Sequence, residues 1–438
     1  WTYVCESRSS SGSYTTKPRI QKDTGLCLLP PPKTPALSAE QAPSSPPFPA
    51  SPRTQHPQTN AWYGVCEARQ FVHADFRCAV LLWLSSFHAM RQAVFAALIG
   101  FCLCLTPAAA ALPDWPHRLA KALDAIDAHG AAQVGVYVLD LQDGVAVSRQ
   151  ADERWYLASM VKVPVAAAVL QGVARGDFSL ASELTLRPED YVDGAGRTNR
   201  YAPGQALSVQ FLMEQMLIHS DNTASDMLIR LVGIDRVNAL VHELWPAGVG
   251  RITTLADVRR AIYSEITPEA RQLAGRDFLR IRAQPTDDAR LGEMFRILEL
   301  LPVANMPTLN QAYANYYATG LNAGRLDAFG RMFAVLEDPA FLPPAQRRWL
   351  LEIMAQVRTG DRRIKAGLPA DVVFAHKTGT QRARFCDGGI ARHVKDASRA
   401  LVIVACVAGD GSLQRSERVL RDVGSAVADS GYFSERGR

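Results

Sequence analysis

The sequence VGVYVLDLQDGVAVSRQADERWYLASMVKVPVAAAVL, residues 134–170, holds the elements that decide the fold. Its first part, 134–141, is β-branched and apolar, which is typical of a strand, and the turn sequence QDG leads into a second strand over 145–148. Residues 159–174 are apolar nearly all round and predict a buried helix. This stretch therefore predicts a hairpin that is followed closely by a buried helix.

Strand patterns return only near the other end of the chain, over 372–376, 389–393 and 400–407, and an amphipathic helix over 413–428 follows them. Helical periodicity fills most of the sequence between, and another amphipathic helix over 114–129 precedes the first strand. We predict an α+β fold, with an antiparallel sheet formed by both chain ends, flanking helices and an inserted all-α domain. The predicted α/β subdomain comprises 112–158 and 366–438, and the all-α subdomain comprises 159–365.

Residues 1–89 differ in composition from the rest, because they hold 11 of the 26 prolines and 4 of the 8 cysteines but no methionine. We interpret them as non-native sequence translated upstream of Met90, with a native proline-rich tail as the alternative. After Met90 the chain has a positive residue, an apolar stretch over 93–105 and then small residues, which is the pattern of an export signal. We predict a signal peptide over 90–111 that is cleaved near Ala111, and a periplasmic or secreted protein.

The apolar stretch of this signal is shorter than the ~20 residues that span a bilayer, so we expect no stable membrane anchor. Residues 1–111 carry +4 of the formal net charge of +5, which leaves the predicted mature chain nearly neutral, at about +1. A near-neutral domain lacks the basic surface that nucleic-acid binding requires. We therefore expect a monomer that acts on a small molecule and binds no nucleic acid.

Two cysteines, Cys386 and Cys406, remain in the predicted mature chain, on strands that flank one hairpin. An oxidising compartment allows such residues to pair, but the strand register decides whether their side chains share a face. We expect two buried thiols, and a disulfide is the alternative.

Three short motifs carry the candidate chemistry: S-x-x-K at 159–162, S-D-N at 220–222 and K-T-G at 377–379. Each motif alone is weak evidence, but the three in this order indicate one site. Ser159 and Lys162 lie one helical turn apart, so both face the same way. A lysine in that position can take the serine proton if burial lowers its pKa, which makes Ser159 the candidate nucleophile and Lys162 its general base.

The other motif residues suit roles in binding and proton transfer. Ser220 can relay a proton to a leaving nitrogen, and Asn222 offers a donor and an acceptor to a substrate amide. Lys377 and Thr378, at the end of the predicted strand, suit a substrate carboxylate.

Residues that follow complete the candidate site. Gly379 lets a substrate approach the backbone closely, and the N–H of Thr380 can form an oxyanion hole with that of Ser159. Arg382 and Arg384 come next, and either can bind a substrate carboxylate through two hydrogen bonds, with an exposed turn arginine as the alternative.

With these motifs, the chain resembles the class A β-lactamases, within the penicillin-recognising serine hydrolases. Residues 134–170 are similar to that family's first hairpin and nucleophile helix, and the 61 residues from Ser159 to Ser220 are close to its spacing. Tyr191 resembles the family's aromatic residue at the cleft wall. The resemblance implies a β-lactamase/transpeptidase-like fold and the opening of β-lactam amides through an acyl-enzyme on Ser159, with no metal and no cofactor.

Two features depart from the family. The interval from Asn222 to Lys377 is 155 residues, so the region 223–376 is expanded. The matching segment RITTLADVRRAIYSEITPEARQL, 251–273, lacks the E-x-x-L-N sequence that supplies the deacylating base. We consider Glu265 the candidate, with two others and a solvated charge as alternatives: Glu269 and Asp257.

Without a positioned base, an acyl-enzyme forms but hydrolyses slowly. Two other functions therefore stay open. One is acyl transfer from a peptidoglycan peptide, as in a D-alanyl-D-alanine carboxypeptidase or penicillin-binding protein. The other is a β-lactam-binding sensor that does not hydrolyse its ligand.

Overall fold

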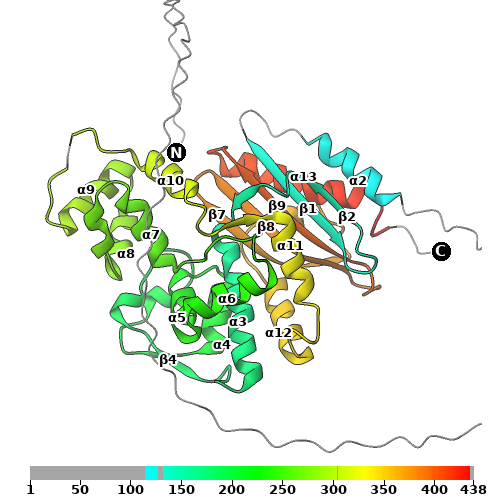
Figure 1. The fold of residues 1–438 in the computed structure, drawn as a ribbon, viewed down its shortest axis with the longest axis horizontal. Coiled ribbons are helices and arrows are strands. Elements are labelled where there is room, and N and C mark those ends of the chain that lie inside the picture. Colours follow the sequence, from blue (N-terminus) through cyan, green and yellow to red (C-terminus); the bar gives the residue numbers. More distant parts are fainter. Residues whose placement is uncertain (1–113, 127–131, 303, 435–438) are drawn as a thin grey trace, which may run out of the picture. The chain divides into compact units, whose positions relative to one another are not determined.

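The computed structural model describes residues 114–126, 132–302 and 304–434, all within one compact unit (Figure 1). The segments that we predict as upstream translation and as signal peptide, 1–89 and 90–111, lie outside the described residues. Among the helices that the structure describes, none is long and apolar enough to cross a membrane.

A five-stranded antiparallel sheet confirms the predicted α+β fold. Its strand order is β2-β1-β9-β8-β7, so strands from both chain ends pair at its centre. Side chains of β1 alternate between the two faces, because Val136 and Val138 enter one hydrophobic core and Tyr137 enters the other. The strands are β1 (Gln133–Asp140), β2 (Ala146–Arg149), β7 (Val372–Gln381), β8 (Arg384–His393) and β9 (Ala400–Ala408).

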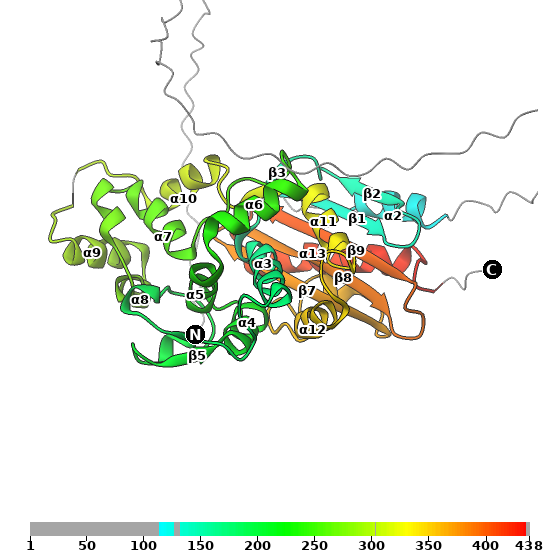
Figure 2. The same ribbon diagram turned by 60° about the horizontal axis from the view of Figure 1, so that its bottom comes forward.

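Helices cover both faces of this sheet (Figures 1 and 2). Helices α2 and α13 pack on one face, and α11 and α12 pack on the other. The buried face of α2 carries Trp115, Leu119 and Leu123, as its spacing predicts, although the helix ends at Asp124. The four helices are α2 (Trp115–Asp124), α11 (Leu326–Val335), α12 (Pro344–Ala355) and α13 (Leu413–Asp429).

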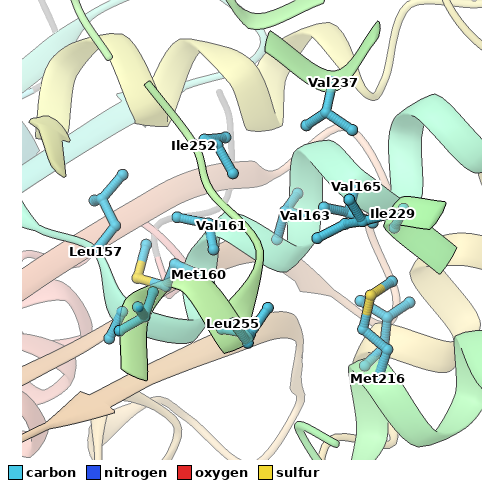
Figure 3. Close-up of a cluster of buried hydrophobic side chains, with 14 of the residues drawn as sticks. Leu157, Met160, Val161, Val163, Val165, Met216, Ile229, Val237, Ile252 and Leu255 are labelled. Carbon is cyan, nitrogen blue, oxygen red and sulfur yellow. The ribbon is translucent and has the colours of Figure 1, made fainter. Parts of the chain in front are cut away.

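Helix α3 (Lys162–Arg175) is buried along most of its length, as its apolar sequence predicts. Figure 3 shows its Val165 among side chains of the surrounding helices, including Met216, Ile229 and Val237. This packing fixes the start of α3 at Lys162, the last residue of the S-x-x-K motif, and the motif's other residues lie in the 3-10 helix directly before it. The surrounding helices are α4 (Val209–Ile218), α5 (Asn222–Val232), α6 (Ile234–Leu244) and α7 (Leu255–Ser264).

Three short strands, β4, β5 and β6, interrupt the region that the sequence predicts as all-α. Because β6 pairs with β3, the chain just before α11 returns to the segment that precedes Ser159. The pairs are β3 (Arg154–Tyr156) with β6 (Ala323–Arg325), and β4 (Glu183–Thr185) with β5 (Ala206–Ser208).

Three short helices between α7 and β6, which we call the expanded helices, lie within the region predicted as expanded. Helix α8 contacts α9, and α10 contacts α7. Thr286 and Thr308 cap α9 and α10, since each side chain accepts a hydrogen bond from the backbone N–H three residues ahead. The expanded helices are α8 (Arg276–Ala283), α9 (Asp287–Ile297) and α10 (Leu309–Ala318).

Strand β7 is longer than the predicted strand over 372–376. It pairs with β8 residue by residue as far as Gln381, which lies opposite Arg384. The prediction that Lys377 and Thr378 lie at the end of a strand is therefore wrong, because the K-T-G motif is inside β7. The turn that ends the strand comes only at Arg382 and Ala383.

Cys386 and Cys406 form a disulfide, so the expectation of two buried thiols is wrong. The reason is the register of β8 and β9, which places the two residues directly opposite each other. Opposed residues of antiparallel strands point to the same face of a sheet. The bond therefore joins β9 to β8, and β8 is the neighbour of the K-T-G strand β7.

Candidate active site

Ser159 lies in a short 3-10 helix, η1 (Ala158–Val161), directly before α3. Ala158 has a φ of 49°, a left-handed conformation that costs free energy and tends to occur at functional sites. Strand β7 lies against this segment, because a Cβ on Gly379 would stand 2.3 Å from the carbonyl oxygen of Leu157. We expected Gly379 to make room for a substrate, but its missing side chain makes room for the backbone beside Ser159.

Lys162 is fully buried, and its ammonium is held by the S-D-N motif. Its Nζ donates to the backbone oxygen of Ser220 at 2.7 Å, to Ser220 Oγ at 3.2 Å and to Asn222 Oδ1 at 2.7 Å. Burial disfavours the charged form and lowers the pKa of Lys162 to about 7. The lysine is thus neutral in a substantial fraction of molecules near neutral pH, as a general base must be.

Lys377, also fully buried, contacts the same serine. Its Nζ donates to Ser220 Oγ at 3.0 Å and to the backbone oxygen of Thr378 at 2.9 Å. Burial, aided by the nearby charge of Lys162, holds the pKa of Lys377 well below its usual value. When both lysines donate, the two lone pairs of Ser220 Oγ are occupied and its own proton is left to donate elsewhere.

The backbone at the S-D-N motif is itself specialised. Ser220 has a φ of 61°, in the loop between α4 and α5. Asp221 caps α5 and accepts from the backbone N–H groups of Thr198 and Ala224, at 2.9 and 3.0 Å. Asn222 Nδ2 donates to the backbone oxygen of Asp193 at 2.6 Å, so both ends of this amide are bound. These bonds hold the motif in one geometry.

Arg363 is a site residue that the sequence analysis missed. It is buried, and it donates to the backbone oxygens of Gly379 and Cys386, at 3.0 and 2.8 Å, and to Thr380 Oγ1 at 2.7 Å. Nearby, the hydroxyl oxygens of Thr359 and Thr378 lie 2.6 Å apart. No motif in the sequence marks Arg363, because its partners are backbone atoms of strands far along the chain.

A cavity of about 760 Å³ brings five of the predicted site residues together. Residues of all three motifs line it, and they are joined by residues that the sequence analysis did not single out, among them Arg259, Arg363 and Tyr313. The predicted residues in its lining are Ser159, Ser220, Asn222, Thr378 and Thr380.

Six predicted site residues do not line this cavity: Lys162, Lys377, Gly379, Tyr191, Arg384 and Glu265. Tyr191 is fully buried and its hydroxyl donates to the backbone oxygen of Tyr201 at 2.7 Å, so it does not form a cleft wall. Arg384 stacks on the ring of Tyr317, 4.7 Å from its centroid, while its neighbour Arg382 does line the cavity. In each case the position of the side chain depends on packing between elements that are far apart in the sequence, and local sequence patterns do not determine that packing.

Glu265 also lies away from the cavity, where it accepts a hydrogen bond from Asn315 Nδ2 at 3.0 Å. The other two candidates, Glu269 and Asp257, are exposed and line no part of it either. Among the described residues, the carboxylates that do line the cavity are those of two residues with arginine partners: Asp193 and Glu417.

Each of these two carboxylates already has a cationic partner. Asp193 accepts from Arg259 Nε at 2.5 Å and from its Nη2 at 3.0 Å. Glu417 Oε1 lies 3.4 Å from Arg363 Nε. In the part of the chain that the structure describes, no carboxylate in the cavity lining is therefore free to activate a water molecule.

The sheet, the helical insertion and the three convergent motifs define a penicillin-recognising serine hydrolase fold. The chain belongs to the β-lactamase enzyme family, whose family model matches residues 118–430. A β-lactamase from Streptomyces fradiae is 29% identical over 301 residues, which cover 66% of this chain and 79% of that protein. The β-lactamase VEB-1 from Pseudomonas aeruginosa is 20% identical over 268 residues, 60% of this chain and 71% of that protein.

Solved structures share the fold at low sequence identity. A β-lactamase from Xanthomonas campestris pv. campestris superposes with a TM-score of 0.54 at 23% identity, covering 73% of this chain and 99% of that one. A PBP-A variant, solved as an acyl-enzyme with penicillin G, superposes with a TM-score of 0.53 at 19% identity, covering 72% and 95%. These structures establish the fold of the chain.

Proposed function

We propose that this protein opens β-lactam amides through a covalent acyl-enzyme on Ser159. The observation that carries the proposal is the buried lysine of the S-x-x-K motif, whose pKa is lowered to about 7 and whose Nζ reaches Ser220 and Asn222. The β-lactamase relatives give the same substrate class.

The acylation step follows from the roles of these side chains. Neutral Lys162 takes the proton of Ser159 as its Oγ bonds to the lactam carbonyl carbon. The backbone N–H groups of Ser159 and Thr380 are the proposed donors to the developing oxyanion. The ring C–N bond then breaks, and the nitrogen takes a proton from Ser220, which recovers one from Lys162 across their 3.2 Å contact.

We assign the substrate carboxylate to the side of β7 that lines the cavity. Thr378, Thr380 and Arg363 line the cavity there. Hydroxyl and guanidinium groups bind a carboxylate through charge-assisted hydrogen bonds. We therefore assign carboxylate binding to these three residues, while the buried Lys377 orients Ser220 through its hydrogen bond to Oγ.

Deacylation is expected to be slow. The carboxylates of Asp193 and Glu417, which line the cavity, are each paired with an arginine. These guanidinium contacts occupy carboxylate oxygens that a hydrolytic water would need as hydrogen-bond acceptors. The same observation favours the second candidate function, in which the acyl group of a D-alanyl-D-alanine peptide is transferred and β-lactams act as slowly released inhibitors.

We also propose that the protein is exported and monomeric. The signal sequence over 90–111 supports export. The disulfide between Cys386 and Cys406 agrees with an oxidising compartment, since such bonds are rare in the cytosol.

The test is the intact mass of the purified protein over time, in the presence of benzylpenicillin. An adduct on Ser159 that disappears as the drug is consumed supports β-lactam hydrolysis, and an adduct that persists supports the penicillin-binding function. The variant Ser159→Ala should form no adduct with either outcome. An adduct that forms equally in this variant, or no adduct at all in the natural protein, contradicts the proposal.

A further inference from the structure

The expanded helices contribute part of the wall of the cavity that contains Ser159. Arg282 of α8, Arg290 of α9 and Tyr313 of α10 line it, and so does Arg382, directly after β7. Figures 1 and 2 show α8 and α9 side by side, next to α7. Three arginines from separate elements thus line the cavity, and we call Arg282, Arg290 and Arg382 the arginine cluster.

Two members of the arginine cluster share one carboxylate. Asp287 accepts from Arg382 Nη1 and Nη2 at 2.7 and 2.8 Å, and from Arg290 Nη1 at 2.9 Å. These guanidiniums hold the pKa of Asp287 below its usual value, so it stays charged. Two positive charges against one negative charge leave an excess of one at this position.

Arg282, the third member, has no such partner. Within the described residues its side chain makes no hydrogen bond, ion pair or ring contact, and it is exposed at the cavity. It adds the cluster's third guanidinium to the cavity lining, in a predicted mature chain whose total charge is only about +1. The unpaired guanidinium offers a planar pair of donors that matches a carboxylate.

Two members of the arginine cluster, Arg382 and Arg290, are also held in place before any ligand arrives. The guanidinium of Arg382 lies over the ring of Tyr313, 5.0 Å from its centroid, and also donates to Asn310. Arg290 Nε donates to the backbone oxygen of Gln284 at 3.1 Å. Groups fixed in this way lose little conformational entropy on binding a ligand.

The position of the arginine cluster relative to β7 suggests what it binds. Arg382 follows Thr378 by four residues, which corresponds to about 13 Å of extended chain. One acyl donor can therefore have a carboxylate near Thr378 and reach the cluster with its other end. We propose that the arginine cluster is a subsite for a second carboxylate, on the acyl side chain of the substrate. This inference rests on the proposed function and names its substrate class.

The test uses three penicillins that differ only in the α-substituent of the side chain. Carboxybenzylpenicillin has a carboxylate there, benzylpenicillin a hydrogen and aminobenzylpenicillin an ammonium. We expect the second-order rate constant for acylation of Ser159 to fall in that order, by roughly tenfold from the first to the last, because the arginines attract one substituent and repel the other.

Arg282→Gln should bring this ratio toward one. The matched control is Arg271→Gln, because Arg271 in η4 (Pro268–Gln272) is also exposed and has no partner among the described residues, but does not line the cavity. The control should keep the full ratio. Two peptides ending in D-alanyl-D-alanine, acidic or amidated at the preceding residue, extend the comparison from β-lactam donors to peptide donors.

The outcomes separate this inference from the proposed function. Acylation without preference for the acidic member of either series overturns the inference and leaves the proposed function in place. A preference that survives in Arg282→Gln as fully as in Arg271→Gln also overturns it. Failure of every penicillin to acylate Ser159 contradicts the proposed function itself.

Discussion

Two sets of basic side chains lie in different environments: two lysines are buried beside Ser220, and the arginines line the cavity. Lys162 and Lys377 are fully buried and both reach Ser220, and burial lowers the pKa of each. Arg282 is exposed in the cavity lining, and Arg382 is half-buried there. Burial thus prepares a lysine to exchange a proton, while partial exposure keeps an arginine available to attract an anion.

The comparison predicts that replacing the buried Lys162 lowers the acylation rate constant far more than replacing an exposed lysine does. Lys162→Met should lower the rate constant for acylation by benzylpenicillin by on the order of a thousandfold, because it removes the proposed general base, whose Nζ contacts Ser220 and Asn222. Intact-mass kinetics measure this rate. Lys395→Met, at an exposed position, should react as the natural protein does. Equal rates for the two variants would remove Lys162 from the mechanism.

The same contrast predicts a distinct pH profile for acylation. Lys162 accepts a proton only in its neutral form, so the rate constant should rise about tenfold per pH unit until the pH reaches its pKa of about 7, and level off above it. The arginines stay charged throughout this range and should not contribute to the midpoint. Stopped-flow acylation with benzylpenicillin provides the profile. A midpoint near the ordinary lysine pKa would mean that burial does not prepare this base.

Arg363 extends the comparison to stability, because it is an arginine in a buried position. Arg363→Ala should reduce the free energy of unfolding by roughly 3 kcal/mol, since the carbonyl oxygens of Gly379 and Cys386 would lose their donor. Urea denaturation measures the loss. The adjacent Arg362 is exposed, so Arg362→Ala should change the stability little. Similar midpoints for the two variants would show that Arg363 does not fix β7.

The sequence was informative wherever a role depended on local spacing. Ser159 and Lys162 are one turn apart in any helix, and the three motifs in order predicted the site before the structure placed them in contact. Tyr191 and Glu265 were misplaced because a side chain's distance from Ser159 depends on how helices far apart in sequence pack. The pairing of Cys386 depended on strand register, which no composition or periodicity specifies.

Arg363 and two members of the arginine cluster, Arg282 and Arg290, escaped prediction for a related reason, whereas Arg382 was already a candidate for carboxylate binding. Arginines are common on protein surfaces, and nothing in the sequence of Arg282 or Arg290 marks them as part of one cavity. Their juxtaposition requires the expanded helices to fold against α7, which makes it a property of the tertiary structure. The three motifs were thus predictable from the sequence, whereas the grouping of the arginine cluster at the cavity was not.

The smallest expected effect is the dependence of the acylation rate on salt concentration, which distinguishes the exposed arginine from the buried lysines. Contacts between exposed charges weaken as the Debye length shortens, from about 10 Å at 0.1 M salt to about 3 Å at 1 M, whereas buried contacts are screened much less. Acylation by carboxybenzylpenicillin should therefore slow a few-fold over this range, and acylation by benzylpenicillin should change less. In Arg282→Gln the two penicillins should show the same salt dependence, because the exposed member of the arginine cluster is gone. A steep dependence that persists in this variant would place the salt-sensitive contact at the carboxylate that both drugs share, near Thr378.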